Sequence, residues 1–162
     1  MKRLPRRRLV ILLSLPTLVV VATGFAFVTA AHAARAKTVV MVPEEDRFEP
    51  AFITVKAGGF VRWINSDEDG HTIVSDDFFN TTGQNHHVDM ELPGTEDNGG
   101  QPTSVTLNFG KPGIFVYYCR FHSHLDEAHQ PVAPGPDGGI QDPNGNYGTP
   151  MMGVVVVLPG NA

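Results

Sequence analysis

The pattern of apolar and polar positions from residue 38 onward predicts a series of short β-strands. Apolar, β-branched and aromatic side chains gather in short runs, and glycine, proline and polar turns separate these runs. No long stretch has the 3.6-residue apolar period of a helix, although one short helical turn is expected near 123–129. The expected strands are 38–42, 51–56, 60–65, 71–75, 103–109, 113–118 and 153–158.

This succession predicts an all-β fold, a two-sheet Greek-key sandwich of seven or eight short antiparallel strands. Two segments do not fit the strand pattern and are expected to be long loops. Residues 76–102 contain six acids and no lysine or arginine, and residues 123–150 contain ten glycines and prolines. Loops of this length in a small domain are usually functional or disordered.

The first 33 residues read as an export signal. Five basic residues lie within positions 1–8, an apolar run covers 9–28, and Ala-His-Ala follows at 31–33. We therefore expect a signal peptide over 1–33 and a single domain over 34–162, with the mature protein exported to the periplasm or the cell exterior. The alternative is a retained membrane anchor, because the apolar run is close to the length that spans a bilayer.

Charge and cysteine content narrow the choice of partners. Without residues 1–33 the chain keeps seven basic and seventeen acidic residues, a net charge of −10. Such an acidic domain is a poor candidate for binding nucleic acid, and it would favour a partner with a basic docking surface. Cys119 is the only cysteine, which excludes an intramolecular disulfide.

Four side chains form a candidate metal site. Cys119 ends the expected strand 113–118, and the other three are His71, His122 and Met151, each at a strand end or in the adjoining loop. Loops from different strands converge at one end of a sandwich, so these residues are expected to meet there. Two histidines and a cysteine with a distant axial methionine are the ligands of blue-copper electron-transfer sites. The sequence therefore predicts one copper ion per chain, alternating between Cu(I) and Cu(II).

Three motifs in the same order resemble plastocyanin and amicyanin, members of the cupredoxin family. They are residues 55–65 with 69–74, the Tyr-Tyr-Cys-Arg-Phe-His stretch at 117–122, and Met-Met-Gly with the valines that follow at 151–157. The resemblance covers about 38–158. It implies a cupredoxin fold, a mononuclear type 1 copper site and an electron-shuttle role. It also implies that the backbone of Thr72 hydrogen-bonds the cysteine sulfur, a contact that tunes the potential of such sites.

The chain departs from these relatives after the second histidine. They place only a few residues between that histidine and the methionine, whereas 28 residues separate His122 from Met151 here. His124 would give the wider Cys-x₄-His spacing of azurin, and Met152 neighbours Met151. We favour His122 and Met151 because the Tyr-Tyr-Cys lead-in and the Met-x-Gly ending are plastocyanin-like.

The expected function is transport of single electrons between exported or membrane redox partners. The alternative is an extracytoplasmic copper-binding or copper-delivery protein, in which four further histidines add weak copper sites: His86, His87, His124 and His129. A copper enzyme is not expected, because copper oxidases and nitrite reductases need several such domains and this chain has room for one. Membrane association is expected only if the leader is retained.

Overall fold

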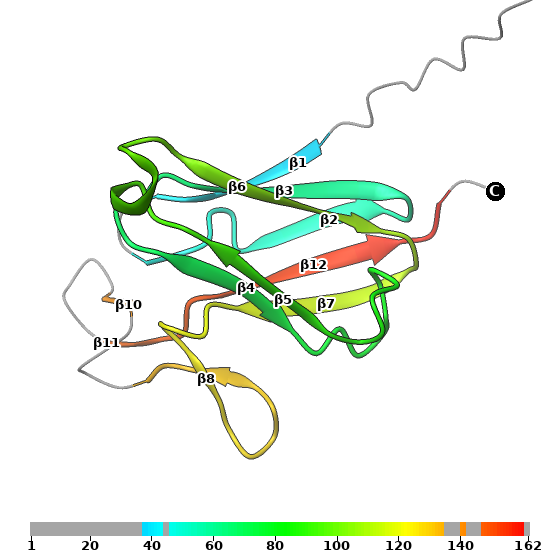
Figure 1. Ribbon diagram of the computed structural model, residues 1–162. Helices are drawn as coiled ribbons and strands as arrows, with labels where there is room; N and C mark the ends of the chain where they lie inside the picture. The colour runs from blue at the N-terminus through cyan, green and yellow to red at the C-terminus, as the bar shows by residue number, and fades with distance from the viewer. Residues whose placement is uncertain (1–36, 44–45, 135–139, 142–146, 161–162) are drawn as a thin grey trace, which may run out of the picture. The chain divides into compact units, whose positions relative to one another are not determined.

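Eight strands form two sheets that pack face to face (Figure 1), as the sequence predicts. The computed structural model describes residues 37–43, 46–134, 140–141 and 147–160. The signal peptide expected over 1–33 lies outside these residues. Among the described residues, no helix is long and apolar enough to cross a membrane.

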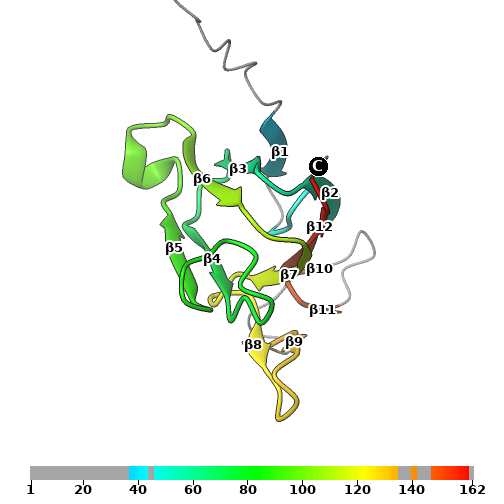
Figure 2. The same ribbon diagram turned by 90° about the vertical axis from the view of Figure 1, so that its right-hand side faces the viewer.

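The smaller sheet has three strands and the larger sheet has five. The smaller has the order β1-β3-β6, with β1 at Lys37–Val42, β3 at Gly59–Asn65 and β6 at Thr103–Phe109. The larger has the order β2-β12-β7-β4-β5, with β2 at Phe52–Lys56, β12 at Met152–Leu158, β7 at Gly113–Tyr118, β4 at His71–Ser75 and β5 at Val88–Leu92. Figure 2 shows the two sheets facing each other in the view turned by 90°.

Two of the strand pairs are parallel, which the expectation of purely antiparallel strands did not include. β1 pairs with β3 and β2 pairs with β12 in parallel register. Both pairings join strands that are not consecutive in the chain. β1 and β2 follow each other in the chain but belong to different sheets. Strand pattern alone carries no information on the direction of such pairs.

The core follows from two-residue alternation along the strands. In β7, Phe115 and Tyr117 point inward, and Cys119 continues the same inward face just after the strand. Val155 and Val157 of β12 alternate in the same way. The buried side chains of both sheets form a single cluster, so one end of the sandwich can hold a site on a rigid base.

The segment 76–102 is not one long loop, and that expectation is wrong. It contains β5 and the short 3₁₀ turn η1 at Glu96–Asn98. β5 reads Val-Asp-Met-Glu-Leu and buries Val88 and Leu92 while its two acids face water. This is a half-buried strand. Its two acids made the segment read as a loop in the sequence, because acidic residues are uncommon in strands.

The segment 123–150 also has more order than expected. It contains two short ribbons, one of β8 at His124–Leu125 with β9 at Pro131–Val132, and one of β10 at Ile140–Gln141 with β11 at Tyr147–Thr149. The helical turn expected near 123–129 is absent there, and a β-hairpin takes its place. The Asp126 carboxylate accepts hydrogen bonds from the backbone N–H groups of Ala128 and Gln130, which closes the hairpin turn in place of a helix.

Candidate metal centre

Cys119 lies inside one end of the sandwich, because it directly follows β7 and continues the inward-facing side of that strand. Its side chain is fully buried, and its backbone N–H donates to the carbonyl of Met151 at 2.9 Å. The chain then turns tightly, since the His122 N–H donates to the Cys119 carbonyl at 3.3 Å. The turn brings Nδ1 of His122 to 3.6 Å from Sγ of Cys119.

His71 reaches the same sulfur from β4. Its Nδ1 lies 3.8 Å from Sγ of Cys119, and its side chain is buried. The donor atoms of His71, Cys119 and His122 all lie within 4.8 Å of one another. The structure therefore brings together three of the four side chains that the sequence singled out, with both imidazoles presenting Nδ1 to the thiol.

Asn65 holds the turn that precedes His71, and sequence reasoning missed it. Its buried amide nitrogen donates to the carbonyls of Asp69, Leu92 and Pro93 at 2.8, 3.1 and 3.1 Å. Its amide oxygen accepts the N–H of Asp67 at 3.0 Å. The sequence did contain a signal for this role, since an asparagine ends an apolar strand just before the turn that leads to His71. Asparagine side chains often satisfy backbone groups in turns.

Met151 is joined to both neighbouring ligand segments through its backbone. Its N–H donates to the carbonyl of His122 at 3.3 Å, and its carbonyl accepts from the backbone of Cys119 and from Oγ of Ser123 at 3.1 Å. Its side chain is fully buried, whereas that of Met152 is half-buried. The long insertion therefore leaves Met151 beside the cluster.

Hydrogen bonds make Cys119 acidic. Burial alone would raise the pKa of its thiol, but contacts from His122, His71 and the backbone of Phe121 and Thr72 outweigh burial and lower that pKa to about 5. Burial opposes protonation of the two imidazoles, yet the sulfur and nearby carboxylates raise the pKa of both His71 and His122. At neutral pH the group therefore holds a thiolate, the form that binds soft metal ions.

Thr72 contacts the sulfur as expected. Besides the backbone contact that lowers the pKa of Cys119, its hydroxyl lies 3.8 Å from Sγ and donates to it. The same hydroxyl oxygen accepts the N–H of Arg120 at 2.9 Å. Thr72 thus ties β4 to the segment that follows Cys119.

Two carboxylates face the outer nitrogens of the imidazoles, and the sequence did not single them out. Asp67 Oδ2 lies 3.1 Å from Nε2 of His71 and is buried. Asp46 Oδ1 lies 3.8 Å from Nε2 of His71 and 3.5 Å from Nε2 of His122. The side of each ring opposite the sulfur is therefore negatively charged.

The remaining histidines do not join the cluster. His124, in β8, is exposed, as are His86, His87 and His129. In the part of the chain that the structure describes, none of these four belongs to a group of three candidate metal ligands. The structure places His122, rather than His124, next to the thiol.

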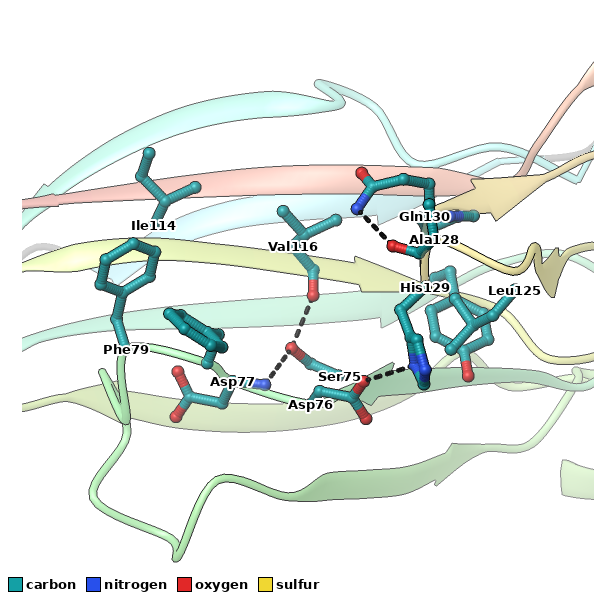
Figure 3. A pocket seen from close by; sticks show the side chains of 13 residues that line it. Ser75, Asp76, Asp77, Phe79, Ile114, Val116, Leu125, Ala128, His129 and Gln130 are labelled. Carbon is teal, nitrogen blue, oxygen red and sulfur yellow. Dashed lines mark hydrogen bonds and ion pairs between the residues drawn. The ribbon is translucent and has the colours of Figure 1, made fainter.

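The β8–β9 hairpin instead forms one wall of an apolar cavity of about 520 Å³ against β4 and β7 (Figure 3). Ile114 lines it from β7, Phe79 from the turn after β4, and Leu125 from the hairpin. At its rim Nδ1 of His129 lies 3.7 Å from Oδ2 of Asp76, and both side chains are exposed. The cavity is separate from the His-Cys-His cluster, with which it shares no residue.

Comparisons with known proteins find a matching family model, similar sequences and similar structures. The family model for the cupredoxin-like domain matches residues 17–129. Plastocyanin from Scenedesmus fuscus is 34% identical over 76 residues, which cover 46% of this chain and 74% of that protein. Chloroplastic plastocyanin from Tetradesmus obliquus is 34% identical over 80 residues, covering 46% and 50% of the two chains. Among solved structures, amicyanin from Paracoccus versutus aligns with a TM-score of 0.44 and 17% identity, over 75% of this chain and 81% of amicyanin.

Proposed function

This chain belongs to the cupredoxin-like domain family, and from that premise we propose that it binds one copper ion and carries single electrons. The observation that carries the proposal is the buried cluster of His71, Cys119 and His122, with donor atoms within 4.8 Å of one another. A thiolate flanked by two imidazoles is a donor set that suits both oxidation states of copper.

Each ligand has a distinct part in the proposed site. Nδ1 of His71, Sγ of Cys119 and Nδ1 of His122 would hold the ion, and the thioether of Met151 would be a fourth, weaker ligand. Bound copper would supply the chemistry, accepting one electron as Cu(II) and releasing it as Cu(I). The protein holds the donors in place, because β4, β7 and the backbone bonds of Met151 fix their positions.

His122 is the proposed exit for electrons. Its side chain is 17% exposed, whereas that of His71 is fully buried. The exposed Phe121 packs edge-on to the His122 ring, with centroids 6.5 Å apart. A redox partner could therefore approach the site most closely over this ring.

Four exposed acids support a partner with a basic surface. The turn at 66–70 and the start of η1 are joined by backbone bonds from Thr95 to Asp67 and from Glu96 to Glu68. This acidic edge, defined as Glu68, Asp69, Glu96 and Asp97, lies on the turn that precedes His71 in the chain and on η1. Opposite charges on a partner would speed encounter at this end of the sandwich.

We propose that the protein works outside the cytoplasm, in the periplasm or at the cell exterior, with exported or membrane-bound partners. The leader composition supports this location. The alternative role in copper delivery receives no support from the four further histidines, which form no additional ligand group within the described residues.

An optical spectrum of the copper-loaded protein tests the proposal. An intense visible band from thiolate-to-copper charge transfer, with one copper per chain, is the expected result. A pale spectrum typical of tetragonal Cu(II) with nitrogen and oxygen ligands would contradict electron transport and favour copper handling.

A further inference from the structure

One carboxylate oxygen faces the outer nitrogens of both ligand imidazoles. Oδ1 of Asp46 lies 3.8 Å from Nε2 of His71 and 3.5 Å from Nε2 of His122, and the two rings lie 5.0 Å apart. His71 already has a hydrogen-bond acceptor in Asp67, at 3.1 Å. Asp46 is therefore the acidic residue that the two rings share.

The backbone conformation and the packing around Asp46 fix its position. Asp46 has a φ of 46°, a left-handed conformation that aspartate and asparagine tolerate better than other non-glycine residues. Two residues later, Phe48 is buried and packs edge-on to Tyr117 with centroids 4.8 Å apart. Paired backbone bonds of 2.8 Å between Met41 and Glu49 anchor the same segment to β1.

This anchoring couples Asp46 to the metal site. Tyr117 lies in β7, two residues before Cys119, so the strand that delivers the thiol also holds the segment that carries Asp46. The Asp46 side chain is 30% exposed and that of His122 is 17% exposed, so the charge is only partly screened by water.

We propose that the Asp46 carboxylate favours the oxidised, Cu(II) state of the site over the reduced, Cu(I) state. The inference rests on the proposed function. With both Nδ1 atoms bound to metal, each Nε2 would carry a proton. The proton of His122 faces Asp46, and that of His71 is donated to Asp67 with the Asp46 carboxylate close by. A carboxylate behind a ligand imidazole raises the basicity of that ligand, and a fixed negative charge stabilises the more positive metal ion. Reduction adds one electron from a redox partner or an electrode and removes one unit of the positive charge that Asp46 stabilises.

The substitution Asp46→Asn tests this, because asparagine keeps the shape and tolerates the left-handed backbone while removing the charge. Dissociation constants for Cu(II) and Cu(I) are measured separately by ligand competition on the full chain. We expect the preference for Cu(II) over Cu(I) to fall about tenfold. A tenfold change corresponds to a rise of about 59 mV in the one-electron potential, which voltammetry would show.

The matched control is Glu49→Gln, three residues away in the same segment. Glu49 is exposed and pairs with Arg47 at 3.4 Å, so the variant loses one charge without touching the imidazoles. Its preference for Cu(II) should stay within twofold of the wild type. Asp46→Ala serves as a second variant and should match Asp46→Asn, since both lack the charge. Urea unfolding of each metal-free variant checks that it folds.

The outcomes separate the two proposals. If the wild-type protein shows the thiolate–copper band and Asp46→Asn keeps the wild-type preference, the role of Asp46 is overturned and the electron carrier stands. An equal shift in Glu49→Gln would also overturn it, because the effect would then come from net charge alone. If the wild-type protein binds copper without that band, the proposed function fails and the role of Asp46 fails with it.

Discussion

The phenol of Tyr117 lies directly against Gly153, its partner in the β7–β12 register. A β-carbon on Gly153 would overlap the hydroxyl oxygen and the ring of Tyr117. Tyr117 is fully buried and packs edge-on to Trp63, with centroids 5.2 Å apart. The glycine of the Met-x-Gly motif, two residues after Met151, therefore makes room for a core tyrosine that lies two residues before Cys119.

Replacing this glycine should destabilise the protein. Gly153→Ala forces Tyr117 or β12 to move, and overpacking of this kind costs about 1–3 kcal/mol. Urea unfolding of the metal-free protein measures the loss. Gly110→Ala is the matched control, because a β-carbon there would meet nothing closer than 4.0 Å. Equal stability of Gly153→Ala and the wild type would show that the packing is looser than described.

The thiol of Cys119 should be indispensable for the visible band. Cys119→Ser replaces a soft, polarisable thiolate with a hydroxyl that copper binds poorly, so the absorption should disappear. The spectrum of the copper-loaded variant is the measurement, and thermal unfolding of the metal-free variant shows that the fold persists. A variant that remains intensely coloured would remove Cys119 from the site.

The two histidines after Cys119 should behave differently. His122→Gly opens a position beside the sulfur that added imidazole can fill, because the wild-type ring lies 3.6 Å from Sγ. Imidazole should therefore restore the visible band. His124→Gly removes an exposed ring of β8 and should leave the spectrum unchanged. The reverse pair of results would assign the ligand to His124.

Ionisation of Cys119 should occur at acidic pH in the folded, metal-free protein. The imidazole and backbone contacts outweigh burial and lower the pKa of its thiol to about 5, against about 8.5 for an unperturbed cysteine. A thiol with a depressed pKa stabilises the folded state fully above pH 8.5, and this contribution is lost as the pH falls through 5. The ultraviolet absorbance of the thiolate, taken as the difference from Cys119→Ser, gives the midpoint. A folded-state midpoint above pH 7 would contradict the described contacts.

The acids of segment 76–102 do not form a single docking surface. Asp77 is buried, and its carboxylate accepts hydrogen bonds from the backbone and hydroxyl groups of Thr81 and Thr82. It closes a loop and presents no free charge to a partner. Asp89 forms an ion pair with Arg120. Of the six acids, Glu96 and Asp97 belong to the acidic edge.

Docking should therefore depend on the acidic edge. The double variant Glu96→Gln, Asp97→Asn should slow electron transfer to a basic partner about tenfold at low salt, because charge steers the encounter. Asp76→Asn with Glu127→Gln removes the same charge on the side of the apolar cavity and should have little effect. Stopped-flow rates at rising salt test both, since at 1 M salt the Debye length is about 3 Å. A rate insensitive to salt and to the first variant would assign docking to the apolar surroundings of His122.

The sequence by itself determined most of the strands, the export-type leader composition and the four candidate ligands. Seven of the eight sheet strands were identified with ends within one residue of those observed, and β4, β6 and β7 match in full. The strands could be predicted because each one buries a single face, which makes apolar and polar side chains alternate locally along the sequence. The approach of His122 to Cys119 could also be predicted, because the two residues are close in the sequence and one tight turn joins them.

Tertiary structure alone decided the features that depend on distant partners. β5 was missed because its two acids are stable only on an exposed face that neighbouring strands define. The parallel pairs, the fit of Tyr117 on Gly153 and the approach of Asp46 to His71 and His122 join segments far apart in the chain. No local pattern encodes such contacts, because their energy arises only when folding brings the segments together.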